Sequence, residues 1–203
     1  MESSQKNDFQ KHLPGGETTQ NHLREALNRT PTNTKPLPGF DPNDVIFYHI
    51  DCDEVYPGIY IGDATTAKSK DYLQKLGITH LINAAEGNRF GFVNTDKNYY
   101  ADTNIKYLGL PLADLHSTDI SKYFFTVATF IDEAIKAGGK VFVHCMLGIS
   151  RSATCVLAYL MIKKGMRAIN AIRTVRKNRY VQPNGGFLHQ LAQLDNQLRR
   201  QRL

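Results

Sequence analysis

The sequence predicts an α/β fold in which a mostly parallel central sheet is flanked by helices and closed by a C-terminal helical cap. Two patterns predict this fold. Short aliphatic runs alternate with amphipathic stretches as far as residue 144, and only helical patterns follow. The chain has 203 residues, of which 41% are hydrophobic and 22% charged, so it is long enough to bury one sizeable core.

Each expected element follows from its local pattern. Aliphatic runs bounded by Gly, Pro or polar residues predict strands, over residues 55–63, 78–85, 105–112 and 140–144. Apolar residues at helical spacing predict helices, over residues 64–77, 121–137, 153–165 and 168–179 and after Pro183. Pro57-Gly58 punctuates the first strand, and Gly77 closes the first of these helices.

Residues 1–45 are expected to form a polar, partly disordered N-terminal extension, and residues 46–203 the folded domain. The extension is rich in Asn, Thr, Pro and Gly and has almost no apolar periodicity. One stretch within it, TTQNHLREALNR, places Leu23, Ala26 and Leu27 on one helical face. We therefore expect a short docked helix there, followed by an irregular connector.

The cysteine count and the apolar runs bear on the cellular compartment. Three cysteines are too few, and odd in number, for a disulfide framework, which predicts a reducing compartment: the cytoplasm, the nucleus or both. No apolar run approaches the length of a membrane span. The first 16 residues have no apolar stretch behind their charges, so a secretory signal is not expected.

The net charge of +6 is concentrated near the C-terminus. Residues 161–203 contain ten Lys or Arg and one acid, Asp195. Composition alone is compatible with a nucleic-acid, membrane-surface or phosphoprotein partner, or with solvated helix faces. Nucleic acid is not expected, because only Tyr180 and Phe187 could offer aromatic stacking after Arg167.

The strongest chemical pattern is the segment HCMLGISRS, residues 144–152, between a buried strand and a helix. A tight loop in this position turns successive backbone N–H groups toward one point, and the helix dipole adds positive potential. Gly148 lets the backbone approach a ligand closely, and Arg151 offers a bidentate pair of donors. This cup is suited to a tetrahedral dianion.

Cys145 is expected at the bottom of the cup as a nucleophile. Amides and a nearby Arg favour the thiolate, and such sites lower a cysteine pKa from about 8.5 to about 3.5–7.5. A thiolate aimed at phosphorus can perform covalent catalysis. The alternative interpretation is a small buried hydrophobe. We expect the catalytic role for Cys145 and the buried role for Cys155, which lies within an apolar helix.

Cleavage of a phosphoester also requires an acid that protonates the leaving oxygen. The strands at 105–112 and 140–144 enclose a helix and should be parallel, so their carboxyl ends should lie at the same edge of the sheet. Asp114 is the first acid after the earlier strand. Asp119 lies nearer the helix start and fits a capping role better. Asp114 is therefore the expected acid.

The chain resembles the atypical dual-specificity phosphatases in five segments, LQKLGITHLINAAEG, NIKYLGL, AYLMI, NRYVQPNGGFLHQLAQLDNQL and HCMLGISRS. The resemblance covers roughly Asp51 to Arg199. It implies a cysteine-dependent phosphatase fold, with residues 46–203 as the catalytic domain. It further implies hydrolysis of phosphotyrosine and phosphoserine/threonine in proteins, and it suggests mitogen-activated protein (MAP) kinases as substrates and partners.

What the resemblance implies about mechanism is a two-step reaction without a metal or other cofactor. Cys145 takes the phosphoryl group while Asp114 protonates the leaving oxygen, and Asp114 then acts as a base for water. Arg151 stabilises the transition state. Ser152 helps the thiolate leave, and His144 orients the loop and tunes the thiol.

The resemblance also implies substrate contacts around the cup. They are Met146, Leu147, Gly148, Ile149 and Ser150 in the loop and Phe92, Arg179 and Asn184 at the rim. Arg179 is expected to contact a second phosphate on the substrate. The mouth is expected to be more apolar than in the family member that the chain resembles most. Apolar side chains replace charged and aromatic ones in the loop, and Phe92 replaces a histidine.

Other functions stay open as alternatives. Phosphoinositide phosphatases usually carry Lys in this loop, and residues 146–150 contain none. Phosphatases of RNA ends tend to have Asn or Gly before the arginine and Thr after it, where this chain has Ser150 and Ser152. Classical tyrosine-only enzymes have a longer domain. A catalytically inactive phosphoprotein-binding module typically lacks the cysteine or the arginine. Because Cys145 and Arg151 are both present, an active phosphatase is expected.

Overall fold

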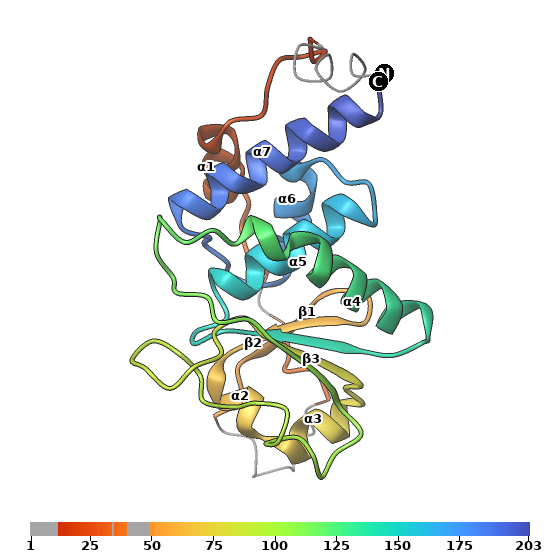
Figure 1. Ribbon diagram of the computed structural model, residues 1–203. Coiled ribbons are helices and arrows are strands. Elements are labelled where there is room, and N and C mark those ends of the chain that lie inside the picture. Colours follow the sequence, from red (N-terminus) through yellow and green to blue (C-terminus); the bar gives the residue numbers. More distant parts are fainter. Residues whose placement is uncertain (1–11, 34, 40–48) are drawn as a thin grey trace, which may run out of the picture.

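The computed structural model describes residues 12–33, 35–39 and 49–203. A five-stranded sheet with the order β1-β2-β5-β3-β4 runs through the molecule (Figure 1). β1 pairs antiparallel with β2, and the remaining pairs are parallel. The strands are β1 (Cys52–Tyr56), β2 (Ile59–Gly62), β3 (His80–Asn83), β4 (Lys106–Gly109) and β5 (Val141–His144). The predicted α/β fold with a mostly parallel sheet is confirmed.

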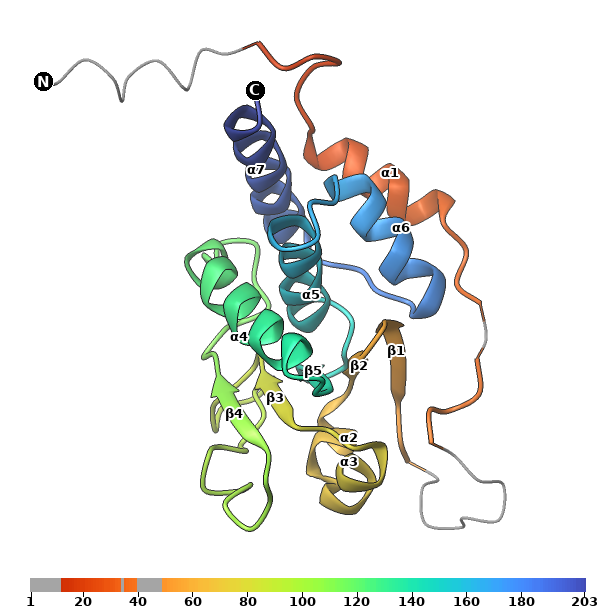
Figure 2. The same cartoon turned by 90° about the vertical axis from the view of Figure 1, so that its right-hand side faces the viewer.

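Helices cover both faces of the sheet (Figures 1 and 2). On one face lie α2 (Ala64–Lys68) and α3 (Lys70–Leu76). The other side holds α1 (Gln20–Arg29), α4 (Phe124–Lys136), α5 (Arg151–Ile162), α6 (Ala168–Asn178) and α7 (Gly185–Gln201), with a 3-10 turn, η3 (Ser121–Tyr123), leading into α4. Within the described ranges, no helix is both long and apolar enough to cross a membrane.

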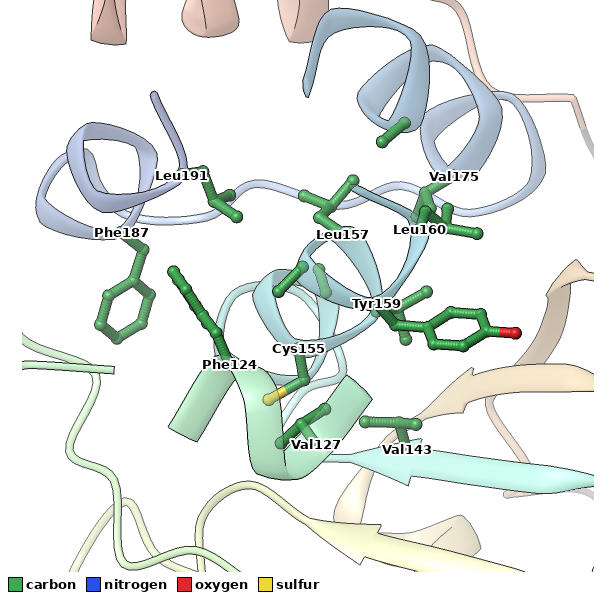
Figure 3. Close-up of a cluster of buried hydrophobic side chains, with 14 of the residues drawn as sticks. Phe124, Val127, Val143, Cys155, Leu157, Tyr159, Leu160, Val175, Phe187 and Leu191 are labelled. Atoms are coloured by element: carbon green, nitrogen blue, oxygen red, sulfur yellow. The ribbon is translucent and has the colours of Figure 1, made fainter. Parts of the chain in front are cut away.

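Side chains of the central strands alternate between two cores. In β5, Val141 and Val143 join the larger core below α4 and α5, whereas Phe142 joins the smaller core beside α3. α5 lies inside the larger core, and Figure 3 shows its side chains among those of α4, α6, α7 and β5. Because both faces of β5 are covered, this strand has no polar side chain between its ends.

The single strand expected over residues 55–63 is in fact part of a hairpin. β1 and β2 pair across the turn at Pro57-Gly58, and Gly58 has a φ of 75°, a conformation that glycine adopts without strain. The sequence prediction placed the punctuation correctly but missed the first strand. The reason is that β1 contains acidic residues, such as Asp53, so its sequence lacks the continuous aliphatic run by which the other strands were predicted.

The single helix expected over residues 64–77 is divided into α2 and α3 at Ser69. The hydroxyl of Tyr100 donates to the carbonyl of Ala67 at 2.7 Å, and that of Tyr99 donates to the carbonyl of Lys68 at 2.8 Å. An uninterrupted helix would offer these two carbonyls to its own next turn. The tyrosines lie about thirty residues away in sequence, so a local pattern could not reveal the break.

The short helix expected in the N-terminal extension is α1, and it packs on α6 and α7. Leu23 and Leu27 are fully buried in the larger core. Thr19 and His22 form a capping box at its first turn. The predicted boundary near residue 45 and residues 1–11 lie outside the described residues, so the expected partly disordered extension over residues 1–45 stays a prediction.

Much of the basic C-terminal region is used inside the protein. Arg199 donates to the carbonyls of Pro14 and Gly16, and Arg200 pairs with Glu17, so α7 holds the N-terminal segment. Six of the seven arginines after Met161 donate to other groups of the protein, and these are Arg167, Arg176, Arg179, Arg199, Arg200 and Arg202.

Candidate active site

Residues 145–150 form a loop, called here the phosphate loop, that leaves the central strand β5 and enters the buried helix α5. Gly148 has a φ of 65°, and a Cβ atom added there would collide with the carbonyl oxygen of Gly62. Only glycine fits this bend. The loop ends at Ser150, the N-cap of α5, so that the first amides of the helix lie beside it.

Cys145 lies at the bottom of the loop, with 2% of its surface exposed. Burial, the largest single influence, acts to raise the pKa of its thiol. Hydrogen bonds from the hydroxyl and amide of Ser152, the charge of Arg151 and the amide of Ile149 outweigh burial, and the pKa lies below its ordinary value. The site therefore favours a thiolate.

The environments of the other two cysteines raise the thiol pKa, in contrast to that of Cys145. Burial raises the pKa of Cys52 to about 12 and also raises that of Cys155, which lies within α5. All three thiols are free. Cys52 also has stabilising partners in Tyr72 and Arg179, but burial dominates its pKa. Only at Cys145 do the donors outweigh burial, as expected for a nucleophile.

The guanidinium of Arg151 is buried beside the phosphate loop. Its Nη1 donates to the carbonyl of Leu112 at 2.9 Å, while Nε lies 3.9 Å from Oδ2 of Asp114. Nε is buried and has no hydrogen-bond partner among the described residues. A buried N–H donor without an acceptor destabilises the folded protein. An oxyanion bound in the cup would supply the missing acceptor.

Asp114 lies next to the phosphate loop, as predicted from the parallel arrangement of β4, β3 and β5. Its Oδ1 accepts hydrogen bonds from the hydroxyl of Ser150 and from Nδ2 of Asn184, both at 2.8 Å. These two hydrogen bonds fix one carboxylate oxygen. The side chain is 36% exposed, so it also remains open to solvent. This placement suits a group that exchanges protons.

Asp119, the other acid of this segment, lies away from the loop. Its Oδ1 accepts from the amide and hydroxyl of Ser121, and the hydroxyl contact lowers the pKa of Asp119. The carboxylate therefore forms a local Asx-turn contact just before η3, whose N-cap is Ile120. The structure thus places Asp114 against the phosphate loop, as the sequence reasoning expected, whereas Asp119 bonds within its own segment.

His144 is fully buried immediately before the nucleophile. Its Nδ1 donates to the carbonyl of Cys145 at 3.1 Å, and its ring stacks on Phe142 with centroids 5.8 Å apart. Burial lowers the pKa of His144 to about 4. A neutral imidazole that holds the first carbonyl of the loop fits the predicted orienting role.

The residues predicted around the mouth, with the exception of Arg179, lie in or beside the phosphate loop. The ring of Phe92 lies 6.0 Å from the guanidinium carbon of Arg151, and Asn184 caps α7 while donating to Asp114. Leu147 is 63% exposed, and Met146 and Ile149 are half-buried. The predicted apolar mouth is therefore compatible with these exposures.

Arg179 is not available at the rim, and the expectation that it contacts a second substrate phosphate does not fit the structure. Only 4% of the residue is exposed. Its Nη1 donates to Asp51 at 2.7 Å and to Asp53 at 2.8 Å, and Nε donates to the carbonyl of Gly148 at 2.8 Å. Acidic and backbone acceptors already occupy the guanidinium, so it cannot also bind a distant phosphate.

The sequence reasoning missed Asp51 and Asp53 as part of this site. Two acids at positions i and i+2 of a strand point to the same side, which is a signal that a cation should lie opposite them. The pattern Asp-Cys-Asp at residues 51–53 carried that signal. It could not show which of the many basic residues is the partner.

Comparisons with known proteins agree with this geometry. A model of the dual specificity phosphatase catalytic domain matches residues 59–197. The structure of the human tyrosine phosphatase-like serine/threonine/tyrosine-interacting protein is 35% identical, with a TM-score of 0.61, over 70% of this chain and 94% of that chain. DUSP15 is 33% identical, with a TM-score of 0.60, over 74% and 94% of the two chains.

A mouse putative dual specificity phosphatase is 25% identical, with a TM-score of 0.65, over 84% of this chain and 95% of that chain. The family model covers well over half of the present sequence and includes Asp114, Cys145 and Arg151. On these grounds, the chain belongs to the dual-specificity phosphatase family.

Proposed function

We propose that this protein is an active phosphatase that hydrolyses phosphotyrosine and phosphoserine/threonine in proteins through a cysteinyl-phosphate intermediate. The observation that carries the proposal is that Cys145, Arg151 and Asp114 come together at one edge of the sheet. Arg151 lies 3.9 Å from Asp114, and Ser150 connects the phosphate loop to Asp114 through its hydroxyl. Nucleophile, anion clamp and acid are thus available in one place.

In the first step, the thiolate of Cys145 attacks phosphorus, and an S–P bond forms as the P–O bond to the leaving oxygen breaks. Asp114 gives its proton to that oxygen. The amides of the phosphate loop and the guanidinium of Arg151 stabilise the charge on the three remaining oxygens. The Nε of Arg151, which has no hydrogen-bond partner among the described residues, gains an acceptor at this point.

In the second step, Asp114 takes a proton from water, and the water oxygen attacks phosphorus as the S–P bond breaks. The departing sulfur becomes a thiolate again. Ser152, whose hydroxyl lies 3.4 Å from the sulfur, stabilises that charge. The reaction requires a free thiol, so a reducing compartment, the cytoplasm or the nucleus, is part of the proposal.

A phosphoprotein-binding module without turnover is the second candidate. One relative, at 35% identity, is named a phosphatase-like interacting protein, so membership of the family does not by itself establish catalysis. The presence of Cys145, Arg151 and Asp114 in one site favours catalysis here.

Phosphorylated proteins are the proposed substrates, and MAP kinases are the specific candidates that family resemblance suggests. Arg179 adds no support for a doubly phosphorylated substrate, because its guanidinium is buried. The exposed Leu147 at the mouth favours a peptide over a highly charged inositol phosphate. The internal use of the C-terminal arginines likewise argues against a nucleic-acid partner.

The test measures phosphate release from p-nitrophenyl phosphate and from matched phosphotyrosyl and phosphothreonyl peptides. We expect turnover of all three by the wild type and none by Cys145→Ser, which should still bind a phosphopeptide. Cys155→Ala is the control and should retain activity. Binding of phosphopeptides by a folded wild type that releases no phosphate would establish the binding module instead.

A further inference from the structure

The carbonyls of the phosphate loop accept hydrogen bonds from donors that lie outside the cup. The donors for the carbonyls of residues 146, 147, 148 and 149 are the amide of Ala64 at 3.1 Å, Nη2 of Arg179 at 3.2 Å, Nε of Arg179 at 2.8 Å and the amide of Gln182 at 2.9 Å. The C=O and N–H of one planar peptide group point in opposite directions. Holding these carbonyls outward therefore turns the following amides into the cup.

Arg179 is the side chain that fixes two adjacent peptide groups of this loop. The second of them joins the carbonyl of Gly148 to the amide of Ile149. That amide donates to the sulfur of Cys145, where it helps to keep the thiol pKa below its ordinary value. A direct chain of contacts thus connects the guanidinium, one rigid peptide plane and the nucleophile.

The guanidinium is itself held in one orientation by Asp51 and Asp53. Asp51 accepts from Nη1 and Nη2, both at 2.7 Å, and Asp53 accepts from Nη1 at 2.8 Å. An arginine has five N–H donors. Here Nε contacts Gly148, the two Nη1 donors contact the two carboxylates, and the two Nη2 donors contact Asp51 and Leu147, so each donor has an acceptor.

We propose that Arg179, oriented by Asp51 and Asp53, is a positioning residue that holds the phosphate loop in its anion-binding conformation. This role rests on the proposed phosphatase function and replaces a direct contact with substrate. It also explains the choice of residue, because a lysine has three donors on one atom and cannot join two carboxylates to two separate carbonyls. Arg179 lies at the C-cap of α6, so this helix supports the loop from behind.

Arg179→Lys tests the proposal while keeping the positive charge between the two carboxylates. The first readout is the pH dependence of Cys145 alkylation by iodoacetamide, mapped by mass spectrometry. We expect the thiol pKa to rise by about one unit, which slows alkylation about tenfold below that pKa. The second readout is the affinity for orthovanadate, measured by calorimetry, which should weaken at least about tenfold because fewer amides face the anion.

The third readout is hydrolysis of p-nitrophenyl phosphate, which carries a single phosphate. A loop-positioning role predicts a fall in kcat/KM of about tenfold or more on this substrate, whereas a residue that binds a second phosphate would leave it unchanged. Alkylation and orthovanadate binding, followed by tryptic mapping and calorimetry, do not depend on turnover. A failure of the proposed enzyme activity is therefore distinguishable from a failure of this inference.

Asp53→Asn is a milder second variant that keeps the shape of the side chain and one acceptor oxygen for Arg179. It should shift the three readouts in the same direction as Arg179→Lys, by a smaller factor. Arg173→Lys, at an exposed position of α6, is the matched control and should change none of them. The inference is overturned if folded Arg179→Lys keeps the wild-type alkylation profile and orthovanadate affinity. The inference is also overturned if Arg179→Lys lowers thermal stability but changes none of the three readouts. It is likewise overturned if this variant loses activity only on doubly phosphorylated peptides.

Discussion

The Sγ atom of Cys145 lies 3.4 Å from the Oγ atom of Ser152, in the first turn of α5. Both side chains are buried, so this hydroxyl is a principal donor to the sulfur. It opposes the effect of burial, which by itself would raise the thiol pKa. In the proposed reaction, the same contact stabilises the sulfur as nucleophile and as leaving group.

Ser152→Ala should therefore raise the pKa of Cys145. A hydrogen bond to a charged group contributes about 1.5–3 kcal/mol, which corresponds to about one to two pKa units. The pH dependence of alkylation measures this shift. Stopped-flow assays should in addition show a burst of product followed by a slower steady state, because hydrolysis of the cysteinyl phosphate becomes limiting. An unchanged alkylation profile would remove Ser152 from both roles.

Asp114→Asn should reduce turnover by about 10²- to 10⁴-fold on a phosphotyrosyl or phosphothreonyl peptide, whose leaving group requires a proton. The loss should be much smaller on an aryl phosphate with an activated leaving group. Asp119→Asn is the matched control in the same segment and should retain activity, because the carboxylate of Asp119 makes only local contacts with Ser121. Equal losses on both substrates, or a larger effect at Asp119, would assign the acid elsewhere.

His144 should make the protein less stable at mildly acidic pH. Its pKa is about 4 in the folded state, whereas the ordinary value for a histidine in water is 6.5, so below pH 6.5 the unfolded chain binds a proton that the folded protein excludes. The associated loss of stability grows as the pH falls from 6.5 toward 4. It reaches about 3 kcal/mol, since each pKa unit corresponds to about 1.4 kcal/mol.

Urea unfolding at several pH values tests this prediction. His144→Asn should flatten the part of the curve between pH 6.5 and 4, whereas His189→Asn, at an exposed position of α7, should leave it unchanged. Carboxylates titrate in the same range, so the comparison is the difference between each variant and the wild type. Identical curves for the wild type and His144→Asn would contradict the assignment.

Mild peroxide should inactivate the proposed enzyme at neutral pH. A thiolate at Cys145 reacts with peroxide to give a sulfenic acid, which a thiol reductant returns to the thiol. Orthovanadate should protect the sulfur by occupying the cup. Mass spectrometry after dimedone labelling locates the product, and labelling at Cys155 with Cys145 unmodified would indicate that the nucleophile is a protonated, shielded thiol.

Leu27→Ala should destabilise the protein by about 2–5 kcal/mol, because the side chain is fully buried and its removal leaves a cavity. Chemical denaturation followed by circular dichroism measures the change. Glu25→Ala, on the exposed side of the same helix, should cost less than about 1 kcal/mol, since it removes only a surface ion pair with Arg29. Equal effects of the two changes would show that α1 contributes little to the fold.

The local patterns of the sequence were sufficient for most of the fold. Strands β3, β4 and β5 and helices α4, α6 and α7 lie within the ranges that their apolar spacing predicted, and α5 begins earlier than predicted, at Arg151. Asp114 could be placed as well, because parallel strands bring their carboxyl ends to one edge. What could not be predicted depends on contacts between distant residues, as at Ser69, where Tyr99 and Tyr100 end one helix and another begins.

Arg179 is the clearest example of this limit. The family resemblance placed it at the rim of the cup, in the turn just before Pro183. Its actual orientation is decided by Asp51 and Asp53, which lie more than 120 residues earlier in the chain. Charge and spacing along the sequence identify a basic side chain but not the direction in which the folded protein points it.

The docking of α1 has a consequence for where the cooperative folding unit begins. The family model starts at residue 59, yet α1 lies before it and contributes Leu23 and Leu27 to the same core as α5. Residues in one continuous core unfold together, so the N-terminal segment shares the global stability of the domain. A protein that binds this segment in an extended form would compete with folding itself, and its affinity would be reduced by the free energy of undocking α1.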